Sequence, residues 1–302
     1  MGARNEMAAT PPRTDDVRLR RKGIIAFLAI AFGLTWIPFL AIPLGLGSYG
    51  TVLMPFAPAI ACFVVRKWVT REGFGDAGLR PNLRRWPLYL LALAWPLAVH
   101  PLRVLLALLL GTAPPGFTFP WGLAAPSPLS LLTWALLPLA AAPLFFGEEF
   151  GWRGYLQLRL LADKPMLAAV ATGVIWGVWH YPLALLGGGP VPDVALSLLL
   201  YPLGTTVSSV LLGWLRLRTG DVWASSVAHG VNNGITDRLA RLAFTGGAGG
   251  TLLGSAAAPS LLAEALVFGA IVAGDWLRRR KRTTASSVGA SALSPGAMGW
   301  ER

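Results

Sequence analysis

Three short polar clusters interrupt the apolar segments of this chain, and their side chains together could catalyse hydrolysis. They are Glu148-Glu149-x-x-x-Arg153, Trp176-x-x-x-His180 and His229-x-x-x-Asn233. Ionisable side chains are costly in hydrocarbon, so a membrane segment that retains them usually has a function for them. Carboxylates, imidazoles and an amide supply a base, a second base or metal ligand, and donors for an oxyanion. The clusters therefore indicate a hydrolytic site assembled from three segments.

The two adjacent glutamates of the first cluster are expected to have different roles. On a helix, neighbouring side chains point about 100° apart, so Glu148 and Glu149 cannot face one pocket equally. Glu149 and Arg153 are four residues apart with the acid first, the favourable order for an ion pair. We interpret Glu148 as the catalytic carboxylate and Glu149–Arg153 as the pair that orients the helix. The alternative is that all three are ordinary charges of a loop after the fourth apolar segment.

Each histidine of the other two clusters has a structural alternative. His180 precedes Tyr181-Pro182, and Trp176 lies one turn earlier on the same helix face, where it could orient the ring. A lone histidine of this kind is often only a hydrogen-bonded structural residue. His229 and Asn233 share one helix face and could donate to one anionic oxygen or help to bind a metal. Alternatively, they form polar contacts between membrane helices.

The composition places these clusters in a membrane protein. The chain is 54% hydrophobic and 13% charged, against about 25% charged in soluble domains. Apolar stretches near the length of a membrane span recur along it. The prediction is an all-α integral membrane protein of about eight transmembrane helices, bent by internal prolines around a polar cavity. The expected segments are 24–45, 52–66, 87–111, 128–146, 166–186, 193–215, 221–236 and 252–276.

The net charge of +12 follows the positive-inside pattern. Of the 26 lysines and arginines, 23 fall in the two tails and in alternate loops, and Arg238 and Arg241 are exceptions. We therefore expect a multi-pass cell-membrane protein with both termini in the cytoplasm. The run Arg278–Arg282 is expected to contact anionic lipid, and nucleic acid is not an expected partner. The expected domains are a basic tail (1–22), a transmembrane domain (23–277) and a basic, disordered tail (278–302).

Taken in order, the three clusters resemble the CAAX-protease and bacteriocin-processing (CPBP or Abi) family of intramembrane proteases. The resemblance rests on Glu-Glu-x-x-x-Arg, aromatic-x-x-x-His and His-x-x-x-Asn, with Trp176 at the aromatic position. The stretch 74–80 also resembles the family, whose core would span about 128–276. The resemblance implies an intramembrane endopeptidase that cleaves a membrane-associated protein or peptide in the lipid bilayer. It implies that Glu148 and His180 activate water, and that His229 and Asn233 stabilise the oxyanion.

Several alternatives remain open from the sequence. Glu148, His180 and His229 could hold Zn²⁺ with an open position, or act in a metal-free glutamate mechanism. A small transporter would also need intramembrane Glu, His and Arg, although no internal repeat supports it. A non-catalytic immunity or scaffold protein could share the fold. The Ala/Leu/Gly/Arg-rich composition is typical of a GC-rich bacterial coding sequence, in which prenylated substrates are not expected.

Overall fold

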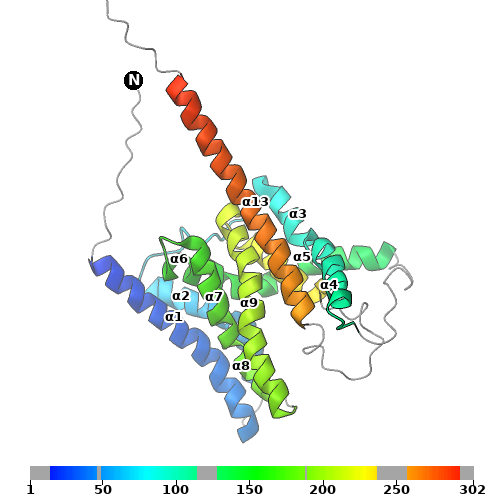
Figure 1. Ribbon diagram of the computed structural model, residues 1–302. Coiled ribbons are helices and arrows are strands. Elements are labelled where there is room, and N and C mark those ends of the chain that lie inside the picture. The colour runs from blue at the N-terminus through cyan, green and yellow to red at the C-terminus, as the bar shows by residue number, and fades with distance from the viewer. Residues whose placement is uncertain (1–13, 46–48, 114–127, 188, 237–256, 293–302) are drawn as a thin grey trace, which may run out of the picture.

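The computed structural model describes residues 14–45, 49–113, 128–187, 189–236 and 257–292, and every regular element in them is helical (Figure 1). The first half has α1 (Thr14–Ala41), a 3-10 turn (Ile42–Leu44), a 3-10 helix (Tyr49–Phe56), α2 (Ala57–Val64), a π-helical turn (Val65–Val69), a 3-10 turn (Leu83–Arg85), α3 (Trp86–Ala94) and α4 (Pro96–Leu109). The second half has α5 (Pro128–Gly151), a π-helical turn (Trp152–Leu156), α6 (Gln157–Leu160), α7 (Pro165–Trp179), α8 (Tyr181–Leu186), α9 (Val191–Thr219), α10 (Trp223–Val231), a π-helical turn (Asn232–Thr236) and α13 (Ala257–Ala292).

Six helical stretches among these residues are long and apolar enough to cross a membrane. They are Asp16–Leu44, Val52–Val69, Leu83–Leu109, Pro165–Leu186, Val191–Thr219 and Ala257–Lys281. The predicted all-α membrane fold with bent helices is thus confirmed. The predicted segment 221–236 is helical as α10 and its π-helical turn, but it is too short to be one of these six spans.

The two ends of the described chain are more helical than the expected tails. Helix α1 begins at Thr14, inside the expected tail 1–22. Helix α13 continues through the basic run to Ala292, where a disordered tail from residue 278 is expected. The expected tail residues 1–13 and 293–302, and the exceptions Arg238 and Arg241, lie outside the described residues.

Glycines allow α7 and α9 to pack at very short range. A Cβ added at Gly177 would lie 2.3 Å from the Pro202 Cα, and one added at Gly173 would lie 2.6 Å from the Thr206 Cα. Membrane helices lack a hydrophobic force between them, and small residues let their backbones approach. The Thr205 hydroxyl adds a hydrogen bond of 2.8 Å to the Gly173 carbonyl. This contact fixes α7, which carries the second polar cluster, against α9.

Helix α7 ends at His180, and α1 stabilises the break. Pro182 has no N–H, so the helix cannot continue with regular hydrogen bonds at this point. The Trp179 carbonyl instead accepts a bond of 3.1 Å from the Trp36 indole of α1. In return, the Trp179 indole donates to the Ala31 carbonyl over 3.3 Å. A neighbouring helix thus satisfies a carbonyl that the break releases, as the membrane interior demands.

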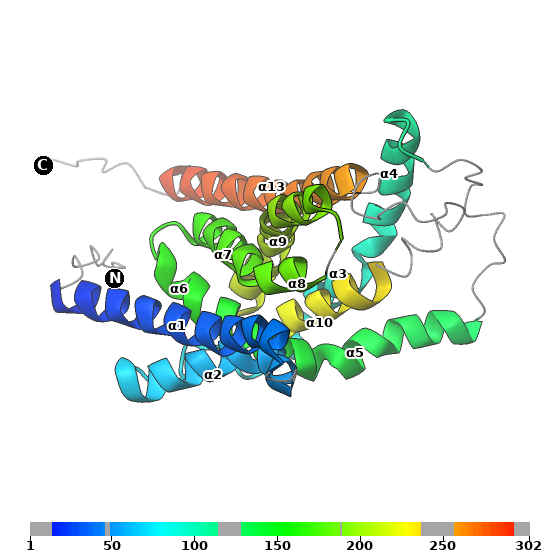
Figure 2. The ribbon, with the colours of Figure 1, turned by 90° about the horizontal axis from the view of Figure 1, so that it is seen from below.

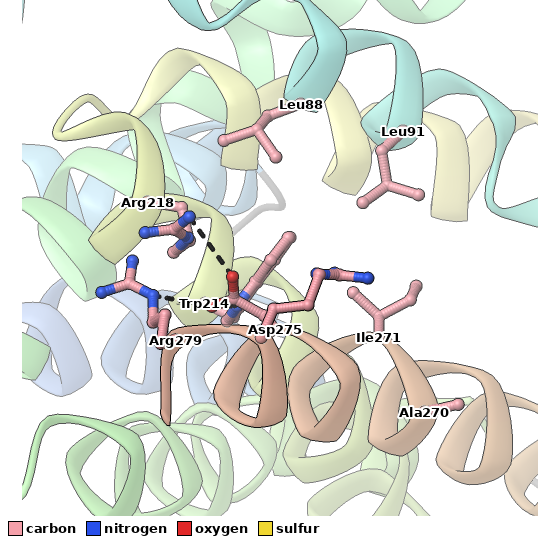
Figure 3. A pocket seen from close by; sticks show the side chains of 9 residues that line it. Leu88, Leu91, Trp214, Arg218, Ala270, Ile271, Asp275 and Arg279 are labelled. Carbon is pink, nitrogen blue, oxygen red and sulfur yellow. Dashed lines mark hydrogen bonds and ion pairs between the residues drawn. The ribbon is translucent and has the colours of Figure 1, made fainter. Parts of the chain in front are cut away.

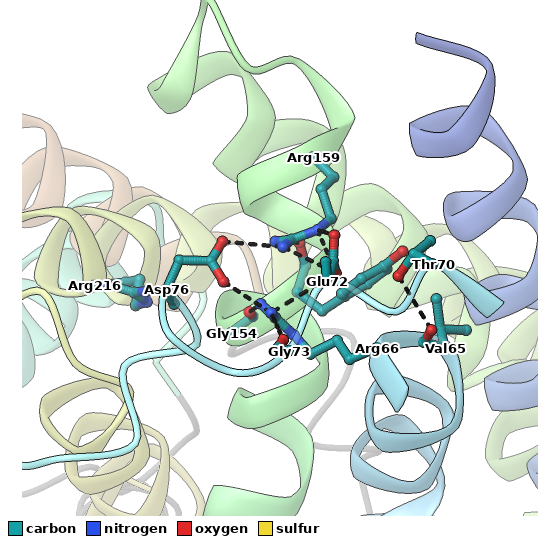
Figure 4. A network of polar contacts seen from close by, with 10 residues as sticks. Val65, Arg66, Thr70, Glu72, Gly73, Asp76, Gly154, Arg159 and Arg216 are labelled. Carbon is teal, nitrogen blue, oxygen red and sulfur yellow. Dashed lines mark hydrogen bonds and ion pairs between the residues drawn. The ribbon is translucent and has the colours of Figure 1, made fainter. Parts of the chain in front are cut away.

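A buried arginine fixes the loop after α2 against the end of α5 (Figure 4). Arg66 is fully buried and donates to the Gly154 carbonyl over 2.6 Å and to the Gly73 carbonyl over 2.7 Å. Its guanidinium also bonds Asp76 over 2.8 Å, and Asp76 pairs with Arg159 of α6 over 3.0 Å. The loop 70–82, part of which matches the expected family stretch, therefore closes over the helix that carries the first polar cluster.

The same loop also holds the start of α10. Gly78 has φ +73°, and a Cβ there would lie 2.8 Å from the Gly220 carbonyl oxygen, so only glycine fits. Asp221 accepts bonds from the backbone N–H groups of Trp223 and Ala224, over 2.9 and 3.1 Å. A carboxylate in this position stabilises a helix N-terminus. Tyr89 of α3 donates to the same carboxylate over 2.9 Å, so α10 is anchored to α3.

Candidate active site

One tryptophan positions the two side chains that are expected to activate water. The Trp176 indole donates to Glu148 Oε2 over 2.8 Å, and the Trp176 carbonyl lies 2.9 Å from His180 Nδ1. Glu148 is only 7% exposed. The three side chains come from α5, α7 and the break after α7. The predicted neighbours Glu148, Trp176 and His180 are therefore brought together.

The hydrogen bond of His180 determines which ring nitrogen is free. A backbone carbonyl can only accept, so Nδ1 must carry a proton and donate it to Trp176. In the neutral ring, Nε2 is then an acceptor, as a base requires. The ring is held from both sides, by Tyr201 in a stacked contact of 5.4 Å and by Trp179 edge-on at 4.9 Å. The bend at His180 thus presents a fixed imidazole within the apolar stretch Pro165–Leu186.

Glu149 joins the first polar cluster to the third. The ion pair predicted with Arg153 is present at 3.2 Å, with both side chains fully buried. The same Oε1 atom lies 2.9 Å from His229 Nδ1. The burial of both glutamates within α5 removes the alternative that they are loop charges. The contact between Glu149 and His229 was not foreseen from the sequence.

Arg153 connects this pair to the rest of the site. Its second nitrogen donates to the Ser209 hydroxyl over 3.1 Å, and Ser209 donates to the Ala169 carbonyl over 2.7 Å. The guanidinium also lies 4.7 Å from the centre of the Trp176 ring, a cation–π contact. Ser209 was missed in the sequence analysis, although the run Thr205–Ser209 is an unusually polar stretch within an apolar span.

A small cavity lies beside His229. It measures about 10 Å³, close to the room that one water molecule needs. Its walls come from α7, α9, α10 and α13 and from Trp95 between α3 and α4, with Trp176, Ser208, His229 and Asn232 as polar members. The expected internal polar cavity is therefore present but narrow.

Asn232, rather than the expected Asn233, faces this cavity with His229. The chain changes to a π-helical turn at Asn232, in which hydrogen bonds span five residues instead of four. The i, i+4 rule that places His229 and Asn233 on one face therefore does not apply unchanged. Asn233 is exposed, and its side-chain oxygen accepts a bond of 3.4 Å from the Asn232 amide. Asn233 thus lies outside the buried cluster.

The donors for a metal ion are only partly assembled. Among the described residues, no three His, Cys, Asp or Glu side chains come together in an arrangement that could hold one. Glu148 and His180 share Trp176 as a partner, whereas His229 is bonded to Glu149. In this arrangement the three side chains do not form the zinc site that the sequence leaves open as an alternative.

Comparison with known proteins agrees with the motif resemblance. Residues 128–235 match the family model of the type II CAAX prenyl endopeptidases, Rce1-like. The family resemblance predicted from the motifs is thus confirmed. The match starts where the expected core starts and includes all three polar clusters, but it ends before residue 276. No curated protein matches the chain.

Proposed function

We propose that this protein is a CAAX-protease-like intramembrane endopeptidase that cleaves a membrane-associated protein or peptide with water activated by Glu148 and His180. The proposal rests on the two hydrogen bonds of Trp176. Its indole donates to Glu148 and its carbonyl accepts from His180, so one residue holds both side chains that would activate water. The Rce1-like match over residues 128–235 supports the reaction class.

The Glu148 carboxylate takes the first proton. Its Oε2 accepts from the Trp176 indole, and its Oε1 makes no hydrogen bond within the described residues, which leaves it for water. His180 Nε2 accepts the second O–H of that water and so aligns its lone pair. The water oxygen attacks the carbonyl carbon as its proton passes to Glu148. The protonated Glu148 then gives this proton to the leaving nitrogen when the C–N bond breaks.

His229 and Asn233 are proposed as donors to the oxyanion. An amide N–H of Asn233 donates without any change of protonation. His229 already donates Nδ1–H to Glu149, so it must carry a second proton on Nε2 to serve as a donor. The carboxylate of Glu149 then faces a positively charged imidazole ring. A fixed donor of this kind in a low-dielectric site stabilises the oxyanion.

The decisive experiment compares two substitutions of buried glutamates. Glu148→Gln keeps the shape of the side chain and removes the base, so turnover should fall by about 10²–10⁴ while folding is retained. Glu264→Gln, at a buried carboxylate on α13, is the matched control and should leave cleavage intact. The readout is the set of membrane peptides that appear in cells with wild type and vanish with Glu148→Gln, together with melting of the purified variants.

Full activity in Glu148→Gln would remove Glu148 as the base. If the wild type produces no membrane peptides beyond those of cells that lack the protein, the transporter or scaffold alternative replaces the peptidase. Elemental analysis tests the metal question in the same samples. Stoichiometric zinc in the wild type, lost in His229→Ala, would contradict the metal-free mechanism.

A further inference from the structure

A second, larger cavity lies away from all the candidate catalytic residues (Figure 3). It measures about 560 Å³, within the range of about 300–1,000 Å³ that small-molecule sites occupy. It opens between α3, α9 and α13, and none of the proposed catalytic side chains lines it. The proposed peptidase chemistry therefore does not account for it.

Positive charge dominates one wall of this cavity. Arg218, Arg278 and Arg279 line it with a single carboxylate, Asp275, which leaves two positive charges in excess. Asp275 is shared: Arg218 lies 3.3 Å from one oxygen and Arg279 3.2 Å from the other. The Nε of Arg218 is buried and has no hydrogen-bond partner within the part of the chain that the structure describes. The wall is thus suited to a further anion.

The opposite wall is apolar. Leu88 and Leu91 of α3 face Ile271 of α13 across the cavity, and the Trp214 ring of α9 forms the base. The Trp214 indole N–H is bonded to Asp275 over 3.2 Å, so the ring is held in place. An occupant that matches both walls must carry an anionic group and an attached hydrocarbon chain.

The depth of the cavity in the membrane indicates which kind of amphiphilic molecule it would bind. The span Leu83–Leu109 begins here, and the spans Val191–Thr219 and Ala257–Lys281 end here. The cavity therefore lies where hydrocarbon gives way to headgroups, the level at which arginines meet lipid phosphates. A molecule drawn from the bilayer can reach this cavity from the side.

We propose that this cavity binds an anionic phospholipid, with its phosphate at Arg218, Arg278 and Arg279 and an acyl chain along Leu88, Leu91 and Ile271. The lipid lies between α9 and α13. These two helices also supply Leu211, Leu212 and Phe268 to the small cavity beside His229. A bound lipid therefore holds α9 and α13 together, and these two helices line the small cavity beside the candidate active site.

The test measures lipid binding to the purified full-length protein in mild detergent. The probes are phosphatidylglycerol, phosphatidylcholine with the same acyl chains, and soluble glycerol phosphate, and the readout is the bound fraction in native mass spectrometry. Wild type should bind one phosphatidylglycerol in preference to phosphatidylcholine. Arg278→Gln with Arg279→Gln should weaken that binding by roughly 20- to 30-fold, since each arginine near an anionic lipid contributes about fivefold.

Two further variants separate this site from general charge attraction. Arg280→Gln with Lys281→Gln removes the same charge from the same helix but leaves the cavity lining intact, and it should bind as wild type does. Ala270→Trp keeps every charge and fills the cavity, and it should lose the bound lipid. Any one of four results would overturn the proposal. They are equal loss of binding in the two double variants, unchanged binding in Ala270→Trp, equal binding of the two lipids, and binding of glycerol phosphate equal to that of phosphatidylglycerol.

Discussion

At the scale of single residues, Trp176 has more functions than the sequence indicates. Its indole holds Glu148, its carbonyl holds His180, and its ring lies against Arg153 and edge-on to His229 at 5.0 Å. A phenylalanine at this position could provide the carbonyl but not the indole N–H. In this chain the aromatic position is therefore part of the hydrogen-bond network that orients the proposed base.

The two adjacent asparagines should differ sharply in their effect on catalysis. Asn232 lines a cavity with room for about one water, which is too small for a peptide carbonyl. Asn233 is exposed and open to an arriving substrate. We expect Asn233→Ala to lower turnover by roughly 10²–10³ and Asn232→Ala to have a small effect. Steady-state cleavage rates of the two purified variants check this, and the reverse order would assign the oxyanion donor to Asn232.

At the scale of elements, the close packing of α7 on α9 sets the positions of Trp176 and Ser209, and through them the site. Two glycines give this contact its short range, and the Thr205 and Ser209 hydroxyls bond α7 carbonyls across it. Because side chains on both helices touch Arg153, a small shift between the helices would separate the proposed base from its supports.

Two glycine substitutions should therefore have opposite outcomes. Gly177→Ala places a methyl group 2.3 Å from the Pro202 Cα, so we expect it to cost about 1–3 kcal/mol and lower the melting temperature. Gly204→Ala is the control, because its Cβ would approach nothing closer than 3.8 Å. It should be neutral or stabilising, since alanine favours helix over glycine by about 1 kcal/mol. Equal melting temperatures for the two variants would show that the contact is looser than described.

The loop that closes over α5 should make stability depend on pH. Burial opposes ionisation of Asp76, but the hydrogen bond from Arg66 and the charge of Arg159 outweigh it and hold the pKa of Asp76 below its ordinary value of 3.8. A carboxylate with a lowered pKa stabilises the fold above its unfolded pKa, and this contribution disappears as the pH falls below 3.8.

Melting between pH 7 and pH 3 measures this contribution. Asp76→Asn should melt lower than wild type at pH 7, and the difference should shrink as the pH falls below 3.8. Asp163→Asn, at an exposed aspartate in the turn after α6, should follow the wild-type curve throughout. If the difference in melting temperature between Asp76→Asn and wild type stays constant down to pH 3, the ion pair is not its cause.

At the scale of the whole molecule, the two ends of the described chain lie together. The first turn of α1 and the last turns of α13 lie at the same end of the helix array (Figure 2). That both termini share one side of the membrane stays a prediction from the charge pattern. The basic residues of the lipid-binding cavity are Arg218 in the last turn of α9 and Arg278 and Arg279 of α13.

A reporter that is active only outside the cytoplasm tests this topology. Fused to either terminus it should give no signal, because the basic residues cluster with the termini and basic segments stay in the cytoplasm. A fusion within the expected outer loop 113–127 is the positive control and should give a signal. A signal from the C-terminal fusion alone would mean an odd number of crossings.

Local rules predicted the helical segments, their bends and the Glu149–Arg153 pair, because apolar length, proline and i, i+4 spacing act within one helix. They could not predict that Glu149 also bonds His229, because that contact depends on how α5 and α10 meet. The π-helical turn at Asn232 was equally hidden, since the residues Asn232–Thr236 carry no signal that separates it from an ordinary turn. The large cavity forms only where three helices meet, and the sequence indicated no more of it than the basic run Arg278–Arg282.

The hydrogen bond from the Trp36 indole to the Trp179 carbonyl has a consequence for biosynthesis. Their positions differ by 143 residues, so α1 enters the membrane long before its partner has been translated. At about 5–20 residues per second, the indole of Trp36 waits roughly 7–29 s for the carbonyl it will bind. The bend that presents His180 can be secured only after this delay, and α10 with His229 follows later still. An incomplete nascent chain therefore lacks the assembled candidate site.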